Sequence, residues 1–195
     1  MKSIKLFFYL VIFTTIAYAQ QIPDKEDQIA AAVQAAPEEF RSSATVLGYD
    51  KKGDLITLRK GTNAMICLAD DPSKDGFSAA AYHKDLEPFM ARGRELRAEG
   101  KSHGEIFEIR EQEAKNGTLK MPERGATLHI LFGNNAKYNR ETKKVENAIY
   151  RYVVYIPWAT TESTGLPTSP SMMGGPWIMD AGTHRAHIMI NPPAQ

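Results

Sequence analysis

Cys67 and His187 are the two side chains that could serve as nucleophile and general base. An imidazole activates a thiol near neutral pH, and Asp180 or Asn63 could orient that imidazole. Such an arrangement would make the chain a Cys/His-dependent hydrolase or transferase. Two features count against it: Cys67 lies in an apolar stretch that favours burial of the thiol, and no glycine-flanked nucleophile turn surrounds it. The enzyme hypothesis is therefore one alternative among three.

A second group of residues could bind a soft metal. His184, His187 and Met179 lie close together in the sequence, and Cys67 could complete the set. Thioether, thiolate and imidazole ligands suit Cu(I). However, residues three apart in a strand point to opposite faces, and methionines are also ordinary core residues. A copper-binding protein is therefore the second alternative.

The third alternative, which we prefer, is a domain that binds a small ligand or a protein partner. The long segment 157–176 is rich in Thr, Ser, Pro and Gly, and loops of this length are often functional. We expect it to form one surface with the turn at 61–63 and the turn at 184–187. The residues expected to contact the ligand are Asn63, Trp158, Trp177 and His187.

Two stretches of the sequence resemble a group of uncharacterised exported bacterial proteins. The first is Gly61-Thr62-Asn63 followed by Cys67, a G-[ST]-N-x-x-x-C pattern. The second is the tail from Ala181-Gly182-Thr183 to His187-Ile188-Met189-Ile190, an A-G-T-x-x-x-H-I-M-[IV] pattern. The resemblance implies an exported domain and carries no reaction, cofactor or substrate.

The first nineteen residues have the three parts of a secretory signal peptide. Lys2 and Lys5 precede an apolar run, and Ala17-Tyr18-Ala19 places small residues where a signal peptidase reads them. Gln20 stands where a lipoprotein would have cysteine. We therefore expect cleavage behind Ala19 and a soluble periplasmic or secreted product without a membrane anchor.

Composition agrees with a single domain over residues 20–195. Cleavage would leave 195 − 19 = 176 residues and remove two of the 24 basic side chains, giving 22 against 23 acidic ones. This near-neutral balance gives no electrostatic case for nucleic acid. A lone cysteine excludes an intramolecular disulfide. The sequence contains no zinc-protease, dinucleotide or phosphate-loop motif, so the cofactor stays unknown.

Hydrophobic periodicity predicts an α+β domain with an antiparallel sheet, because strands and helices are segregated along the chain. An N-terminal helix is expected over 25–36, with Asp24 as its cap. A helical hairpin insertion is expected over 78–116, with a capping box at 102–105. The expected strands are 44–49, 55–59 and 64–68, forming a meander, then 126–132 and 148–156, which pair, and two short ones at 177–179 and 186–190.

Overall fold

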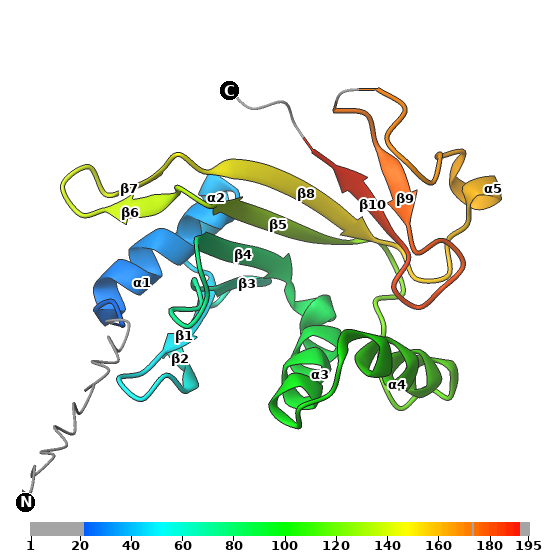
Figure 1. Ribbon diagram of the computed structural model, residues 1–195, viewed down its shortest axis with the longest axis horizontal. Coiled ribbons are helices and arrows are strands. Elements are labelled where there is room, and N and C mark those ends of the chain that lie inside the picture. Colours follow the sequence, from blue (N-terminus) through cyan, green and yellow to red (C-terminus); the bar gives the residue numbers. More distant parts are fainter. Residues whose placement is uncertain (1–21, 173, 192–195) are drawn as a thin grey trace, which may run out of the picture.

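A curved eight-stranded sheet runs through the whole molecule (Figure 1). The computed structural model describes residues 22–172 and 174–191, so the predicted signal peptide and its cleavage site lie outside the described residues. The strands are β1 (Thr45–Tyr49), β2 (Leu55–Arg59), β3 (Met65–Leu68), β4 (Phe77–His83), β5 (Ala126–Gly133), β8 (Ile149–Tyr155), β9 (Trp177–Met179) and β10 (His187–Ile190). Their order in space is β2-β1-β3-β4-β5-β8-β10-β9.

Every neighbouring pair in this sheet is antiparallel except β1 and β3, which are parallel. The predicted antiparallel meander of the first three strands is therefore wrong. After β2 the chain crosses the start of β1 and enters the sheet on its other side. Gly61 makes this crossing possible, because a Cβ there would lie 2.2 Å from the Thr45 nitrogen and 2.4 Å from the Ser43 carbonyl oxygen.

The helical hairpin predicted over 78–116 begins too early, since its first residues, 78–83, belong to strand β4. Its alanines favour helix locally. In the fold they are needed in a strand, because Ala79 and Ala81 are fully buried under an overlying helix. Tertiary packing has overridden local propensity.

The predicted pairing of the two strong strands is confirmed, with β5 and β8 in register from Ala126↔Tyr155 to Phe132↔Ile149.

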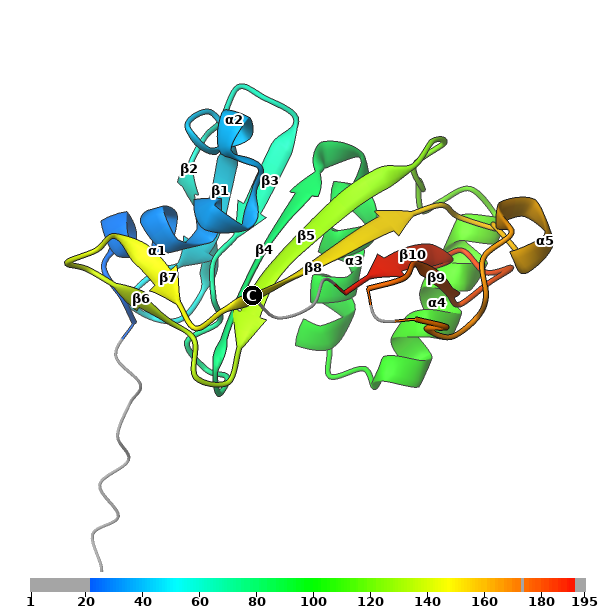
Figure 2. The same ribbon diagram turned by 90° about the horizontal axis from the view of Figure 1, so that it is seen from above.

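One face of the sheet is covered at the β1–β4 end by α1 (Lys25–Ala32) and the 3-10 turn Val33–Ala35, which leads into the short helix α2 (Glu38–Arg41) (Figure 2). Small residues of α1 and this turn pack on Val46, Cys67 and Ala79. Alanines allow the helix to approach the sheet closely, and this contact forms one of the hydrophobic clusters of the core. The predicted N-terminal helix is confirmed, and its last turn is a 3-10 turn.

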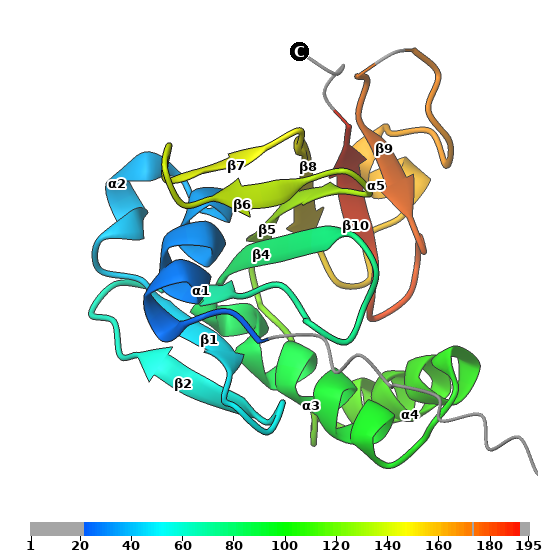
Figure 3. The same ribbon diagram turned by 60° about the vertical axis from the view of Figure 1, so that its left-hand side comes forward.

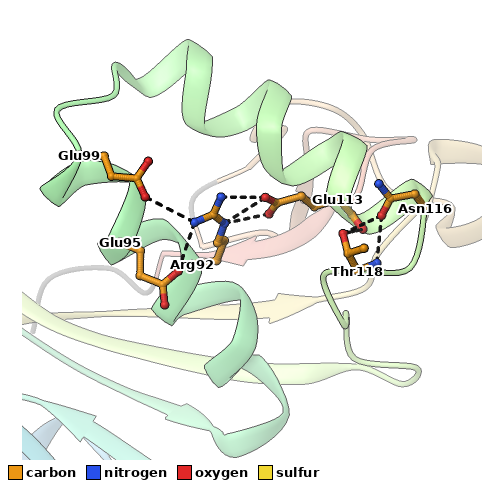
Figure 4. Close-up of polar contacts among 6 residues, drawn as sticks. All are labelled: Arg92, Glu95, Glu99, Glu113, Asn116 and Thr118. Carbon is orange, nitrogen blue, oxygen red and sulfur yellow. Dashed lines mark hydrogen bonds and ion pairs between the residues drawn. The ribbon is translucent and has the colours of Figure 1, made fainter.

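The opposite face is covered by the helical hairpin, α3 (Glu87–Ala98) and α4 (His103–Lys115) (Figure 1). Phe89 of α3 is 2% exposed and packs on Tyr155 of β8, with ring centroids 5.4 Å apart. Arg92 of α3 joins the two helices, because its Nε and Nη2 donate to the Glu113 carboxylate of α4 at 2.8–3.0 Å (Figure 4). The hairpin is thus fixed by an apolar contact with the sheet and by a forked ion pair between its helices.

A second small sheet, β6 (Lys137–Asn139) and β7 (Lys144–Glu146), projects from the β5–β8 connection and lies beside α1 (Figure 3). The Gln34 side chain holds it there, accepting from the Val145 N–H at 2.9 Å and donating to the Lys143 carbonyl at 3.2 Å.

The chain folds as one α+β domain. Within residues 22–172 and 174–191, none of the helices has the length and apolar character needed to cross a membrane.

Candidate functional site

The structure separates Cys67 from His187. Cys67 of β3 lies in one cross-strand row with Ala81, His129 and Tyr152, on the face covered by α1. His187 lies opposite Tyr155 on the other face, four strand positions away, which is about 19 Å at the usual spacing. Burial raises the pKa of the Cys67 thiol to about 11. These positions leave no cysteine–histidine dyad, and Asp180 is instead bound by the Arg185 guanidinium at 2.7 Å.

The residues predicted as metal ligands are only partly brought together. Met179 and His187 are directly opposite one another on β9 and β10. His187 donates its Nδ1 proton to the Arg185 carbonyl at 2.6 Å. His184 is fully buried, and its Nδ1 lies 3.0 Å from the Glu111 carboxylate. No cluster of three or more His, Cys, Asp or Glu side chains able to hold a metal occurs in the described part of the chain.

The four residues predicted to contact a ligand do not form one surface. Trp158, Trp177 and His187 lie at the β8–β10–β9 end of the sheet, whereas Asn63 lies at the start of β3. The Asn63 amide donates to the Phe40 carbonyl at 2.7 Å and accepts from the Met65 N–H at 2.9 Å. Asn63 therefore shapes the crossing after β2, and the predicted single surface is not formed.

The tail motif also has a structural role. It forms the turn between β9 and β10, in which the Thr183 hydroxyl donates to the Asp180 carbonyl at 2.8 Å. This turn is fastened to the end of β8, where the Trp158 N–H donates to the Thr183 carbonyl at 2.8 Å and the Gly182 N–H to the Ala159 carbonyl at 2.7 Å. Trp158 itself has φ of +67° and is 41% exposed, so the turn holds an indole in solvent at some cost in backbone strain.

A groove of about 480 Å³ lies elsewhere, between α1, the β3–β4 loop and β6. Pockets of this size accept small molecules. Side chains at Asp24, Asp27, Gln28 and Ala31 reach it from one side of α1, at the spacing of successive helix turns. The other lining residues are Ile22, Pro23, Ala69, Asp70, Gly76, Phe77, Ala136, Lys137, Tyr138 and Arg140.

The helical wall of the groove carries an ion-pair network. Arg140, which follows β6, donates to the carboxylates of Asp24 at 3.3 Å and Asp27 at 2.5 Å. Asp24 occupies the N-cap position of α1 but makes no side-chain capping bond, because its carboxylate faces Arg140. The predicted capping role of Asp24 is thus replaced by a link between α1 and the small sheet.

Gln28 fixes the floor of the groove. Its amide nitrogen donates to the carbonyls of Pro23 at 2.8 Å and Tyr49 at 2.9 Å, and its oxygen accepts from the Tyr49 N–H at 2.8 Å. Gln28 is 5% exposed, so these bonds satisfy a buried amide and join α1 to β1. These bonds hold α1 against β1 on this side of the groove.

Asp70 lies on the opposite wall, where β3 leads into the loop before β4. Its Oδ1 accepts from the Ser78 N–H at 2.7 Å, which closes the loop. Burial raises the pKa of Asp70 to about 6, and the nearby Asp71 carboxylate acts in the same direction. The structure therefore places a partly buried carboxyl group with a perturbed pKa inside a pocket, a combination that often marks functional sites.

Sequence reasoning missed this groove. It interpreted Asp24 as a helix cap and singled out no other residue of the groove. Comparisons with known proteins find no matching family model, no curated protein similar in sequence and no solved structure of similar fold. The resemblance of the two motifs to exported bacterial proteins thus stays a prediction from the sequence.

Proposed function

We propose that this chain is an exported protein, periplasmic or secreted, that binds a small ligand in the groove between α1 and β6. The single observation that carries the proposal is the groove itself, whose lining combines apolar side chains with five charged ones: Asp24, Asp27, Asp70, Lys137 and Arg140. This is the composition of small-molecule sites, in which apolar residues supply most of the contact and polar groups fix orientation.

The walls of the groove support binding because they are held from several directions. Arg140 joins its rim to α1, Gln34 fastens the small sheet, and Gln28 ties α1 to β1. A site that is formed before the ligand arrives loses less conformational entropy on binding. Tyr138 is half-buried and offers aromatic surface within it, whereas Phe77 lines it from the core and is 8% exposed.

A fragment screen followed by amide NMR tests the proposal. We expect fragments with an apolar ring to shift the amide resonances of residues 69–77 and 136–140, and Tyr138→Ala to weaken their binding about tenfold by removing an aromatic wall. Tyr152→Ala is the matched control, because Tyr152 is exposed on the sheet away from the groove. Shifts that gather at Trp158 and Trp177 instead would contradict the proposal.

Export is tested separately. We expect the secreted or periplasmic fraction to contain a chain that begins at Gln20, as judged by mass spectrometry of the intact protein. Recovery of the whole chain beginning at Met1 from the cell interior would refute this part of the proposal and leave the groove proposal standing.

A further inference from the structure

The charges that line the groove differ in whether they have partners. Asp24 and Asp27 are both paired with Arg140. Lys137 is exposed on β6, where water and salt screen its charge. Asp70 is the remaining charged group, and it is partly buried on the opposite wall.

Asp70 makes no ion pair with a cationic side chain of residues 22–172 or 174–191. The closest candidate in sequence, Lys74, is bound to Asp71 at 2.9 Å. Asp70 accepts the Ser78 N–H through Oδ1, and the Asp71 backbone N–H also favours its carboxylate, but neither donor carries a charge. A partly buried carboxylate without a cation is costly, and a cationic ligand relieves that cost.

We propose that the groove selects ligands with a cationic nitrogen, an ammonium or amidinium group that pairs with Asp70 while an apolar body lies on Phe77 and Tyr138. The inference rests on the proposed function and names the ligand class for that site. A charge-assisted hydrogen bond to a carboxylate is stronger than a neutral one, so the cation supplies affinity as well as orientation. The apolar body fits the aromatic and alanine side chains that line the groove.

Acid should weaken this binding in a way that reports on Asp70. The raised pKa of Asp70, about 6, means that the carboxyl is protonated in mild acid in the unliganded protein. A bound cation favours the carboxylate and lowers its pKa. The affinity for a cationic ligand therefore falls as the pH drops below about 6, while the affinity for a neutral analogue stays level.

The test uses three probes with one aromatic body: phenethylamine, phenethyl alcohol and hydrocinnamate, which are cationic, neutral and anionic at neutral pH. We expect phenethylamine to bind best, with shifts at residues 69–77 and 136–140. Asp70→Asn should weaken phenethylamine binding at least tenfold and remove its dependence on pH, because the amide keeps the shape and loses the charge. Asp75→Asn is the matched control, since Asp75 is exposed in the same loop and does not line the groove.

The outcomes separate the two proposals. Equal binding of all three probes in the groove, unchanged by Asp70→Asn, would overturn the inference about cations and leave the binding function intact. Preference for hydrocinnamate would overturn it as well and would assign recognition to Lys137. If neither these probes nor the fragment screen shifts the groove resonances, the proposed function falls and this inference falls with it.

Discussion

At the scale of single residues, Asp70 and the buried histidines respond to acid in opposite directions. Burial lowers the pKa values of His184 and His187, so the unfolded chain takes up their protons first as the pH falls. Their neutral forms therefore stabilise the fold above the ordinary histidine pKa of about 6.5, and this contribution is lost below it. Asp70 has a raised pKa, so the folded chain takes up its proton first and gains stability as the pH falls through about 6.

These signs can be measured by urea unfolding at about pH 7.5 and about pH 5.5. We expect the free energy of unfolding to fall less on acidification in His184→Asn than in the original chain, because the amide keeps the donor to Glu111 without titrating. We expect it to fall more in Asp70→Asn, which lacks the opposing group. If the free energy of unfolding changed equally between the two pH values in all three proteins, these groups would have the same pKa in the folded and unfolded states.

A capping box holds the first turn of helix α4. The Ser102 hydroxyl accepts from the Glu105 N–H at 3.4 Å, and the Glu105 carboxylate accepts from the Ser102 N–H at 2.9 Å. Ser102→Ala should destabilise the first turn of α4 by about 1 kcal/mol, measured as faster hydrogen exchange of its amides. Ser169→Ala, in the exposed loop before β9, should leave this exchange unchanged. Equal exchange rates in both variants would mean that the hydrogen bonds of the cap contribute nothing measurable.

Elements with a strong local pattern were predictable, and those decided by their neighbours were not. β2, β5 and β8 follow from β-branched and aromatic residues, and the start of α4 follows from its capping box. β4 could not be predicted, because its alanines favour helix and only the packing of α1 on the sheet calls for a strand of small residues. The parallel pairing of β3 depends on a backbone crossing at Gly61, which has no local signature.

The groove was beyond sequence reasoning for a similar cause. Its walls come from α1, the loop after β3 and the strand β6, which are far apart along the chain and meet only in the folded molecule. No motif joins Asp70 to Arg140. The motifs that did attract notice, around Asn63 and Thr183, fix a crossing and a turn. A sequence motif can reflect a backbone conformation that only certain residues can form, such as a crossing or a tight turn, as readily as a binding site.

At the scale of the whole molecule, the two faces of the sheet have separate coverings. α1 and its 3-10 turn pack on one face at the β1–β4 end, and the α3–α4 hairpin packs on the other through Phe89. β3 lies inside the sheet between β1 and β4, beneath α1. A reagent can reach the side chains of β3 on this face only when the helix and the sheet come apart.

The rate at which a reagent modifies the Cys67 thiol therefore reports how often the domain opens. Cys67 is fully buried, so we expect a thiol reagent to modify the native protein only as fast as the core opens, and added urea to accelerate the reaction. Ser169→Cys, with a second and exposed thiol, should show one fast and one slow phase. Rapid modification of the original chain would contradict a closed core. Since the chain has no other thiol, the rate can rank purified variants of the groove or the hairpin by opening frequency, without an activity assay.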